Sequence, residues 1–345
     1  MPHAFAAVFH GPGAPWEFRT LECPELAPGE VLVEISLATI CGSDLHTLSG
    51  RRQEPTPCVL GHEAVGRVVG VGEGRDPEWL GRRVTWTLAD SCGQCPACRQ
   101  WDLPQKCERL FKYGHAPLDN GSGLNGCYAS HVVLRAGTAL IPLPEAVTDR
   151  MAAPANCALA TMCAVTEPYS SGGELAVIQG AGLLGLYGCL LLRAAGWKRV
   201  VLVDRQASRL ALAEAFGGEP WEADSTAALP ENSAGLVVEV AGAPELVAQG
   251  IRWLRPGGVY AWAGMVHPQS QLQLSGETVI RKCLTVRGTH NYAPRHLAAA
   301  VSFLATRARL HPWDRLVAPP RPLRELAEAI VLAESGVWPR VSLQP

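Results

Sequence analysis

The chain has 345 residues, which is long enough for two domains, and 48% of them are hydrophobic while 18% are charged. Such a composition is typical of a compact enzyme with a sizeable core. The formal net charge of −2 and the interleaving of acidic and basic residues argue against a nucleic-acid-binding or membrane-surface protein. Since we find no signal-like leader and no run of about 18 apolar residues, we expect a cytoplasmic protein.

The first part of the chain, residues 4–150, is predicted to be rich in β-strands. Short apolar or alternating runs, such as Val31–Ile35 and Val65–Val69, are separated by turns that contain Gly and Pro. The pattern then changes, which indicates a second domain with a different architecture.

From residue 175 onwards, short buried strands alternate with helices. We predict strands at 175–179, 199–204, 236–240, 258–263 and 284–287. An apolar helix is expected to end near Ala195, and two later helices are expected at 296–307 and 323–335. This alternation predicts an α/β fold whose parallel sheet is covered by helices on both faces.

The run Gly180-Ala181-Gly182-Leu183-Leu184-Gly185 follows the first of these strands and matches the G-x-G-x-x-G fingerprint of dinucleotide-binding domains. Gly180 permits a tight turn, and Gly182 lets the backbone approach a pyrophosphate. Gly185 lets the helix pack closely on the strand, and the helix N-terminus attracts the phosphate charge. The context of strand, glycine loop and helix therefore predicts a bound NAD or NADP.

The residue at the end of the next strand bears on the choice of cofactor. Asp204 would accept hydrogen bonds from the ribose hydroxyls and repel a 2′-phosphate, which favours NAD. Arg205 and Arg209 leave NADP open, because either could contact a 2′-phosphate. A doubly wound domain could also bind another nucleotide, or none.

Four of the twelve cysteines lie close together in one loop that contains Gly and Pro. In the cytosol, clustered cysteines bind metal more often than they form disulfides. Four thiolates at short spacing can surround a zinc ion completely, which is typical of a structural site. The predicted ligands of this site are Cys92, Cys95, Cys98 and Cys107. The alternative is a set of unrelated buried thiols.

A second set of metal-binding residue types is dispersed: Cys41, the pair His62 and Glu63, and Cys157. Two thiolates and one imidazole leave a fourth position on zinc for water or substrate, as in a catalytic site. From residue types alone, the same side chains could equally be packed core or solvated surface.

Together these motifs resemble the zinc-containing alcohol dehydrogenases of the medium-chain dehydrogenase/reductase superfamily, over nearly the whole chain. The family's signatures appear as Cys41-Gly-Ser-Asp-Leu-His46 and Gly61-His-Glu-Ala-Val-Gly66, followed in order by the cysteine loop and the glycine fingerprint. The resemblance implies a GroES-like catalytic domain (1–156 and 290–345) and a Rossmann domain (157–289). It also implies two zinc ions per chain, NAD, and a homodimer or homotetramer paired through the sheet edge near 284–287.

The resemblance further implies roles for individual residues. Cys41, His62 and Cys157 would bind the catalytic zinc, and Asp44 would orient His62. Glu63 would lie behind the metal and ligate it transiently. The other implied residues are the proton relay Ser43 and His46 and the cofactor contacts Thr161, Leu183, Leu184 and Arg340.

Two features depart from the family pattern. The last spacing in the cysteine loop is eight residues where the family usually has seven, so the loop must bulge if Cys107 is to join the site. Gly42 stands where some relatives have a phosphate-binding Arg, so that contact is expected to be absent.

A narrower resemblance bears on the substrate. Runs such as Leu103–Cys107, Lys112–His115 and Gly288–Tyr292 are similar to a bacterial branch associated with phosphonate metabolism. The candidates for the pocket wall are Trp86, Leu88, Lys112, His115, Met265, His290 and Asn291. Together with Arg295, the basic members of this set would suit a hydroxyalkyl phosphonate or another anionic alcohol. If they are exposed and serve solubility only, an uncharged alcohol or polyol is the alternative.

The implied reaction is hydride transfer between an alcohol and NAD. Zinc would lower the pKa of the alcohol, and Ser43 and His46 would carry its proton towards solvent. The competing classes are a zinc-free quinone reductase of the same fold, a non-catalytic NAD- or zinc-binding relative, and a redox-sensing zinc protein. The full set of ligand residues argues against the first of these.

Overall fold

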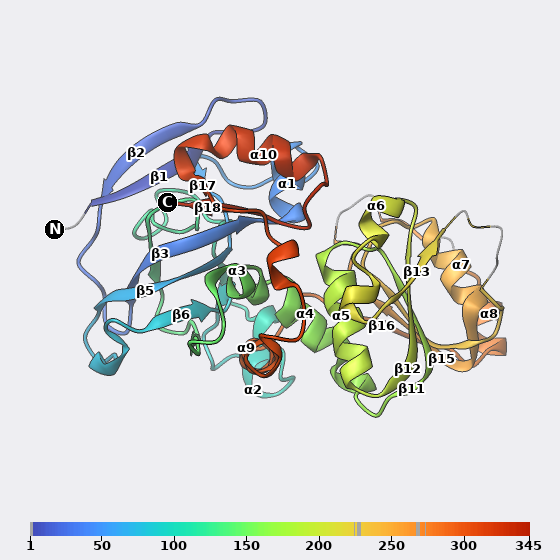
Figure 1. Cartoon of the computed structure of the whole chain (residues 1–345). Helices are drawn as coiled ribbons and strands as arrows, with labels where there is room; N and C mark the ends of the chain where they lie inside the picture. The colour runs from blue at the N-terminus through green and yellow to red at the C-terminus, as the bar shows by residue number, and fades with distance from the viewer. Residues whose placement is uncertain (1–2, 224, 226–228, 267–269, 273) are drawn as a thin grey trace. The chain divides into compact units, whose positions relative to one another are not determined.

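The structure is a computed structural model that describes residues 3–223, 225, 229–266, 270–272 and 274–345. It divides into two compact units, the first made of residues 1–160 and 292–345 and the second of residues 161–291 (Figure 1). The sequence-based boundaries stood at 156/157 and 289/290. The structure thus assigns Cys157 to the first unit, together with the other dispersed metal-binding residues.

The first unit is built around mainly antiparallel sheets, as its alternating sequence pattern predicts. The main sheet has the strand order β10-β6-β5-β3-β18-β17, with β9 also paired to β3, and β2-β1-β4 and β7-β8 form two smaller sheets. Its strands are β1 (His3–Phe9), β2 (Glu17–Glu22), β3 (Val31–Ile40), β4 (Cys58–Val59), β5 (Glu63–Val71), β6 (Arg83–Trp86), β7 (Ala89–Asp90), β8 (Phe111–Lys112), β9 (His131–Leu134), β10 (Leu140–Pro142), β17 (Arg321–Pro322) and β18 (Val341–Gln344). The C-terminal strand β18 lies beside β3, with Val341 opposite Ile40.

The helices of this unit are short, apart from α9 and α10, which correspond to the two predicted C-terminal helices. The α-helices are α1 (Gly42–Leu48), α2 (Pro96–Arg99), α3 (Asp149–Ala152), α9 (Pro294–Arg307) and α10 (Leu326–Glu334), while α4 (Ala158–Thr166) crosses the boundary between the units. The 3-10 helices are η1 (Pro77–Trp79), η2 (Pro104–Lys106), η3 (Ala153–Asn156), η6 (Trp313–Arg315) and η7 (Leu323–Glu325).

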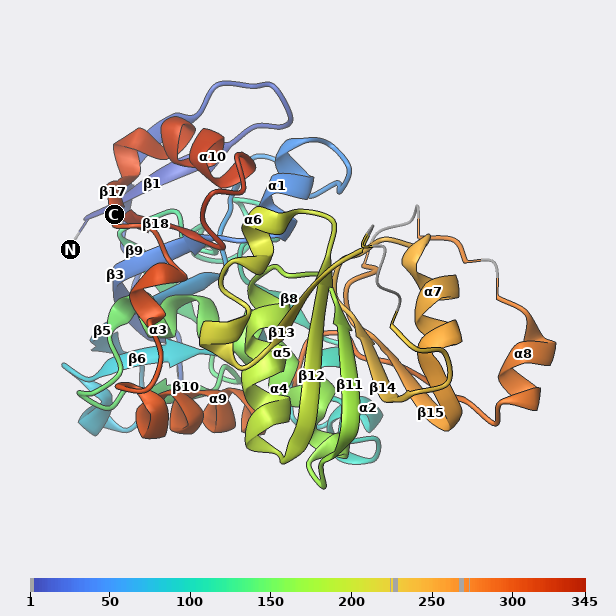
Figure 2. The ribbon, with the colours of Figure 1, turned by 45° about the vertical axis from the view of Figure 1, so that its right-hand side comes forward.

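The second unit contains a six-stranded, fully parallel sheet in the order β13-β12-β11-β14-β15-β16, which confirms the predicted fold class. The central strands meet through buried valines, with Val177 opposite both Val201 and Val237. Figure 2 shows these strands side by side, flanked by α5 and α7. The elements are β11 (Gly173–Gln179), β12 (Trp197–Asp204), β13 (Glu219–Glu222), β14 (Ala234–Glu239), β15 (Leu254–Trp262), β16 (Thr285–Gly288), α5 (Leu183–Ala194), α6 (Ala207–Leu210), α7 (Leu246–Trp253), α8 (Gly276–Arg281), η4 (Glu167–Tyr169) and η5 (Glu214–Phe216).

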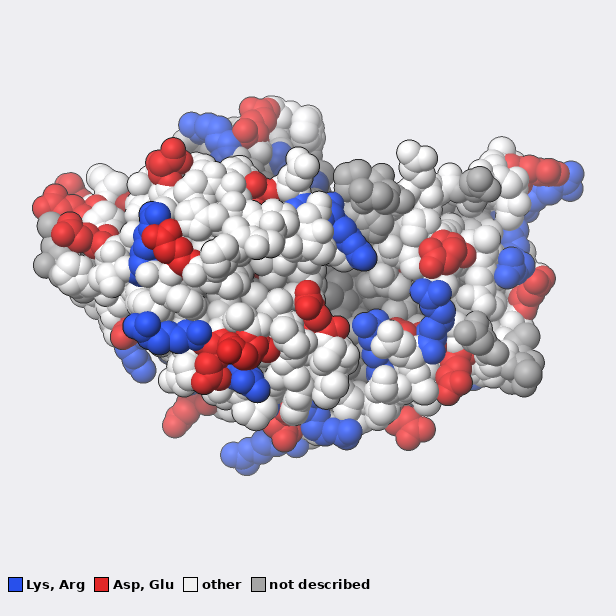
Figure 3. Space-filling view, turned by 90° about the horizontal axis from the view of Figure 1, so that it is seen from above, with Lys and Arg blue, Asp and Glu red and all other residues white. Residues whose placement is uncertain are grey.

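The distribution of charged side chains on the surface agrees with the small net charge of the sequence (Figure 3). On the face in Figure 3, basic and acidic side chains are interspersed, as the small net charge leads us to expect. Within the part of the chain that the structure describes, we find no helix with the length and apolar character needed to cross a bilayer.

Candidate metal centres and cofactor site

The four dispersed metal-binding side chains converge in the first unit. The ligand atoms of Cys41, His62, Glu63 and Cys157 all lie within 4.8 Å of one another. The sulfurs of Cys41 and Cys157 are 4.0 Å apart, close to the roughly 3.8 Å expected for two thiolates on one tetrahedral zinc ion. Two thiolates and an imidazole are a donor set that suits zinc, so the residues present fit this metal.

Neighbouring strands bring these ligands together. Cys41 follows β3 and caps α1, while His62 immediately precedes β5, the strand that pairs with β3. Gly61 has φ 88°, and a Cβ on it would lie 2.5 Å from the ring of Tyr128. A glycine is therefore needed before His62, because the backbone there is left-handed and the Tyr128 ring leaves no room for a side chain.

Asp44 holds two of the ligand residues in place. Its carboxylate accepts hydrogen bonds from the Cys41 amide (2.8 Å) and the Tyr128 hydroxyl (3.0 Å), and lies 3.5 Å from Nδ1 of His62. Burial lowers the pKa of His62, but Asp44 and Cys41 outweigh burial and raise it to about 10. Since a metal binds the neutral imidazole, metal binding at His62 competes with protonation.

Glu63 forms a buried ion pair with Arg340. The Arg340 Nε atom donates to Glu63 Oε2 at 2.9 Å, and the Thr39 hydroxyl donates to the same oxygen at 2.6 Å. Burial raises the pKa of Glu63 to about 7, although Arg340 opposes this shift. The other guanidinium nitrogens donate to Cys41 Sγ, Glu63 and the Pro339 carbonyl. Since every nitrogen has a partner within the first unit, the contact between Arg340 and a cofactor phosphate stays a prediction.

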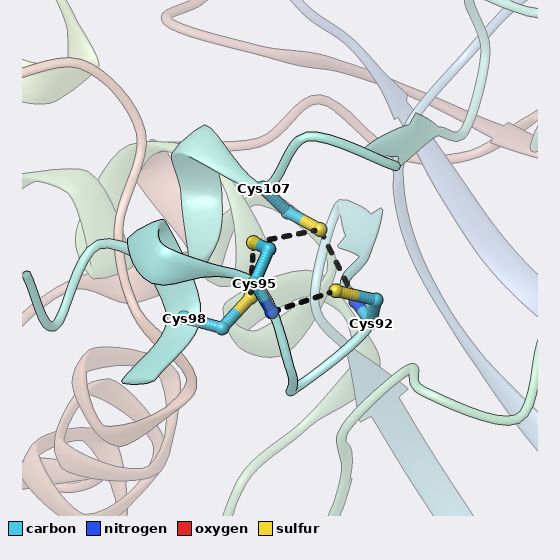
Figure 4. Close-up of side chains that lie close together, drawn as sticks. All are labelled: Cys92, Cys95, Cys98 and Cys107. Carbon is cyan, nitrogen blue, oxygen red and sulfur yellow. Dashed lines mark hydrogen bonds between the residues drawn. The ribbon is translucent and has the colours of Figure 1, made fainter. Parts of the chain in front are cut away.

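The cysteine loop forms the second candidate metal centre. Figure 4 shows the four sulfurs directed towards one another, with Cys95 Sγ 3.5 Å from Cys98 Sγ and 3.8 Å from Cys107 Sγ. Backbone amides also donate to the sulfurs, and those of Gln94 and Cys95 lower the pKa of Cys92 to about 6. Amide donors favour thiolates, so these residues fit a closed, four-sulfur zinc site.

The eight-residue spacing before Cys107 does not separate this residue from the cluster. The segment between Cys98 and Cys107 contains Asp102, whose φ is 53°, followed by the 3-10 turn η2. Asp102 also binds Arg295 at 2.8 Å, in a pair that is largely exposed. Arg295 thus has an acidic partner, and its expected role in the substrate pocket stays a prediction.

The glycine loop in the second unit has the geometry that a dinucleotide needs. Gly180 has φ 113°, and Gly182 caps the N-terminus of α5. The Asp204 carboxylate accepts hydrogen bonds from the amides of Ala181 and Gln206, which fixes it beside the loop. An added Cβ at Gly182 would meet nothing within 4 Å, so the backbone there is open to a pyrophosphate.

Gly182→Ala and Gly185→Ala are expected to separate cofactor binding from stability. A Cβ at Gly185 would lie 2.0 Å from the Gly180 carbonyl oxygen, so Gly185→Ala should lower the melting temperature. Gly182→Ala should keep the melting temperature but weaken NADH binding by about tenfold, because its methyl group occupies the pyrophosphate space. Thermal unfolding and a fluorescence titration with NADH measure the two effects. Equal loss of stability in both variants would contradict this assignment.

For the other predicted cofactor contacts of the second unit, the structure gives burial and one exposed ion pair but no feature that points to a cofactor. Arg205 lies 3.7 Å from Glu245 in an exposed pair, and Arg209 is exposed on α6. Thr161 lies half-buried on α4. The cofactor roles of these residues, and of Leu183 and Leu184 at the start of α5, stay predictions.

Four pocket candidates lie in the first unit. Trp86 and Leu88 are buried, and Trp86 belongs to the core formed with Phe111 and Tyr113. Lys112 is half-buried, and the ring of His115 stacks on that of His62 with centroids 5.4 Å apart. Burial, together with the nearby charge of Lys112, lowers the pKa of His115 well below its usual range, so this residue adds no charge near pH 7.

Two further residues beside His115 were not predicted. Glu54 accepts a hydrogen bond from Nδ1 of His115 at 2.8 Å, and Arg52 binds Glu54 at 2.6 Å. Nothing in the segment Arg51-Arg52-Gln53-Glu54 marks it as part of a site, because the contact spans 61 residues of sequence. Only the three-dimensional structure could reveal it.

The remaining candidates stay predictions. Met265, His290 and Asn291 belong to the second unit, where Met265 packs at the edge of the core and Asn291 has φ 58°. Ser43 and His46 both lie half-buried on α1, three residues apart.

Comparison with known proteins agrees with this geometry. Residues 27–145 match the alcohol dehydrogenase GroES-like domain, and residues 184–306 match the zinc-binding dehydrogenases. The chain is 30% identical to a sorbitol dehydrogenase from Halalkalibacterium halodurans, over 87% of this chain and 88% of that protein. It is 28% identical to a 5-exo-hydroxycamphor dehydrogenase from Pseudomonas putida, over 92% and 93%. The crystal structure of an alcohol dehydrogenase from Thermotoga maritima covers 100% of both chains with a TM-score of 0.92 and 31% identity.

Proposed function

Since this chain belongs to the family of zinc-binding alcohol dehydrogenases, we propose that it transfers hydride between NAD and an anionic alcohol, such as a hydroxyalkyl phosphonate. The choice of an anionic substrate rests on the position of one basic residue, Lys112, near the candidate metal site. This half-buried residue ends β8, which pairs with β7, and begins the turn that ends at His115. His115 in turn stacks on the metal-binding His62. Gly114, within this turn, packs so closely on Gly61 that a Cβ there would lie 2.5 Å from the Gly61 oxygen. A cation held beside the metal site suits an alcohol with a negative group.

In this proposal, residues of the first unit bind the catalytic metal and transfer the proton of the alcohol. Cys41, His62 and Cys157 would hold zinc, which would supply the Lewis acid that lowers the pKa of the alcohol. Asp44 orients His62 through the contact at Nδ1. Ser43 and His46, on α1, pass the alcohol proton towards solvent.

The second unit holds the cofactor in this proposal. The open backbone at Gly182 and the N-terminus of α5 receive the pyrophosphate, and Asp204 receives the ribose hydroxyls. The four cysteines of the loop would occupy every position of a structural zinc, which would therefore take no part in the reaction.

The test is NADH formation by the zinc-loaded enzyme with matched alcohols. 2-Hydroxyethylphosphonate and 2-hydroxyethanesulfonate are compared with an uncharged alcohol of the same length. We expect the anionic alcohols to have the higher kcat/KM, and Lys112→Met to reduce this preference by about tenfold, because one charge contact is lost. Lys198→Met, which removes an exposed lysine paired with Glu174, serves as the matched control. Equal or better turnover of the uncharged alcohol would favour a polyol or simple alcohol, as the name of the sorbitol dehydrogenase relative suggests.

The preference for an anion should also depend on pH. Burial lowers the pKa of Lys112 below the usual lysine value, and the charge of Arg52 lowers it further. The amine therefore loses its proton at a lower pH than an exposed lysine, and its attraction for anions decreases as pH rises. We expect the ratio of kcat/KM for 2-hydroxyethanesulfonate to that for the uncharged alcohol to fall across the alkaline range. The ratio should be flat in Lys112→Met, and a ratio that rises with pH would argue against this role.

We also propose that two copies pair through the edge of the parallel sheet. The strand β16 ends the sheet order, and Ile280 on the adjoining α8 is 76% exposed. Pairing would cover this open edge. A monomer mass in light scattering would contradict the proposal.

A further inference from the structure

Glu54 lies between two basic groups beside the candidate substrate site. Its side chain is only 8% exposed, and it binds Arg52 at 2.6 Å and His115 at 2.8 Å. The Arg52 side chain is 32% exposed, so part of it reaches solvent. A buried carboxylate with two such partners is held in one position.

Lys112 belongs to the same group of residues. The turn from Lys112 to His115 is closed by a hydrogen bond from the His115 amide to the Lys112 carbonyl, at 3.3 Å. His115, the last residue of this turn, binds Glu54, so the turn brings Lys112 close to the pair of Glu54 and Arg52. Arg52 and Lys112 supply two positive charges and Glu54 one negative charge, so the three side chains together carry a single net positive charge.

We propose that Glu54 sets the charge of the substrate, and that the site accepts an alcohol with a single negative charge in preference to one with two. This inference rests on the proposed anionic substrate and narrows it. A sulfonate, a carboxylate or a singly ionised phosphonate balances the net charge of the three side chains. A doubly ionised phosphonate brings a second charge that the buried Glu54 carboxylate repels. Glu54 acts here as a specificity residue and not as a catalytic residue.

The test compares two alcohols that differ mainly in charge. 2-Hydroxyethanesulfonate carries one negative charge, whereas 2-hydroxyethylphosphonate gains its second just above neutral pH, below the alkaline range in which Lys112 loses its proton. With zinc-loaded enzyme and NAD at that pH, we expect a higher kcat/KM for the sulfonate. Glu54→Gln keeps the shape and the acceptor for His115 but removes the charge. It should shift the sulfonate-to-phosphonate ratio towards the phosphonate by about tenfold.

The controls distinguish this inference from the proposed function. Glu78→Gln removes an exposed carboxylate that pairs with Arg82, and it should leave the ratio unchanged. Zinc content and melting temperature show whether Glu54→Gln has kept the fold. If both anions exceed the uncharged alcohol but the ratio does not move in Glu54→Gln, the charge-setting role is wrong while the anionic substrate stands. If neither anion exceeds the uncharged alcohol, the proposed substrate class fails, and the inference fails with it.

Discussion

Replacing Cys41 by Ala should abolish NAD-dependent alcohol oxidation while the fold persists. Cys41 is one of three residues proposed to hold the catalytic zinc, and its sulfur lies 4.0 Å from that of Cys157. With the Lewis acid lost, several kcal/mol of transition-state stabilisation disappear, which corresponds to at least about a thousandfold loss of kcat/KM. The backbone around Cys41 is still fixed by Asp44, so the first unit should keep its structure.

Two measurements accompany this activity assay. Metal analysis should show about one zinc ion fewer per chain, because the cysteine loop keeps its own ion. Circular dichroism should show an unchanged secondary structure. Cys283→Ala, at an exposed cysteine in the second unit, is the matched control and should retain both zinc ions and activity. Full activity in Cys41→Ala would exclude the zinc mechanism and favour a non-catalytic role for the cluster.

Replacing Arg340 by Met should strongly destabilise the protein. Arg340 and Glu63 are both buried and are joined by bonds of 2.9–3.2 Å, so loss of the cation leaves an uncompensated buried carboxyl group. Breaking one side of such a pair costs about 3–5 kcal/mol. For a protein of this size we expect the melting temperature to fall on the order of 10 °C.

The double variant tests the cause of this loss. Adding Glu63→Gln to Arg340→Met removes the unpaired charge, while the Thr39 hydroxyl can still donate to the amide oxygen. The double variant should recover more than half of the lost stability, since the penalty comes from the isolated carboxylate. If Glu63→Gln lowers the melting temperature of Arg340→Met further, the ion pair is not the source of the effect.

The sequence was most informative where spacing and residue chemistry agree. Cys92, Cys95 and Cys98 are close in sequence, and thiolates have few other reasons to cluster, so their convergence was predictable. The strand–glycine loop–helix arrangement around Gly180–Gly185 was predictable for the same reason. The prediction missed β13 (Glu219–Glu222), a strand at the sheet edge whose residues Glu-Pro-Trp-Glu show no apolar pattern.

The surroundings of the candidate catalytic site were not predictable from one sequence. Asn156 donates from Nδ2 to the carbonyls of His62 and Trp86, and the Tyr292 hydroxyl donates to the Asn156 carbonyl. These contacts link segments that lie 94, 70 and 136 residues apart. The sequence around a single polar residue does not indicate a partner that lies far away along the chain. The contact between Glu54 and His115 was unpredictable for the same reason.

The interrupted course of the first unit has a consequence for biosynthesis. A ribosome completes the whole second unit, residues 161–291, before it makes residues 292–345. The second unit is therefore expected to fold during translation. The end of β3 can pair with β18, and Glu63 can pair with Arg340, only once residues 340–343 have been made. The metal-binding unit thus completes its main sheet and its buried ion pair only after the second unit has been made.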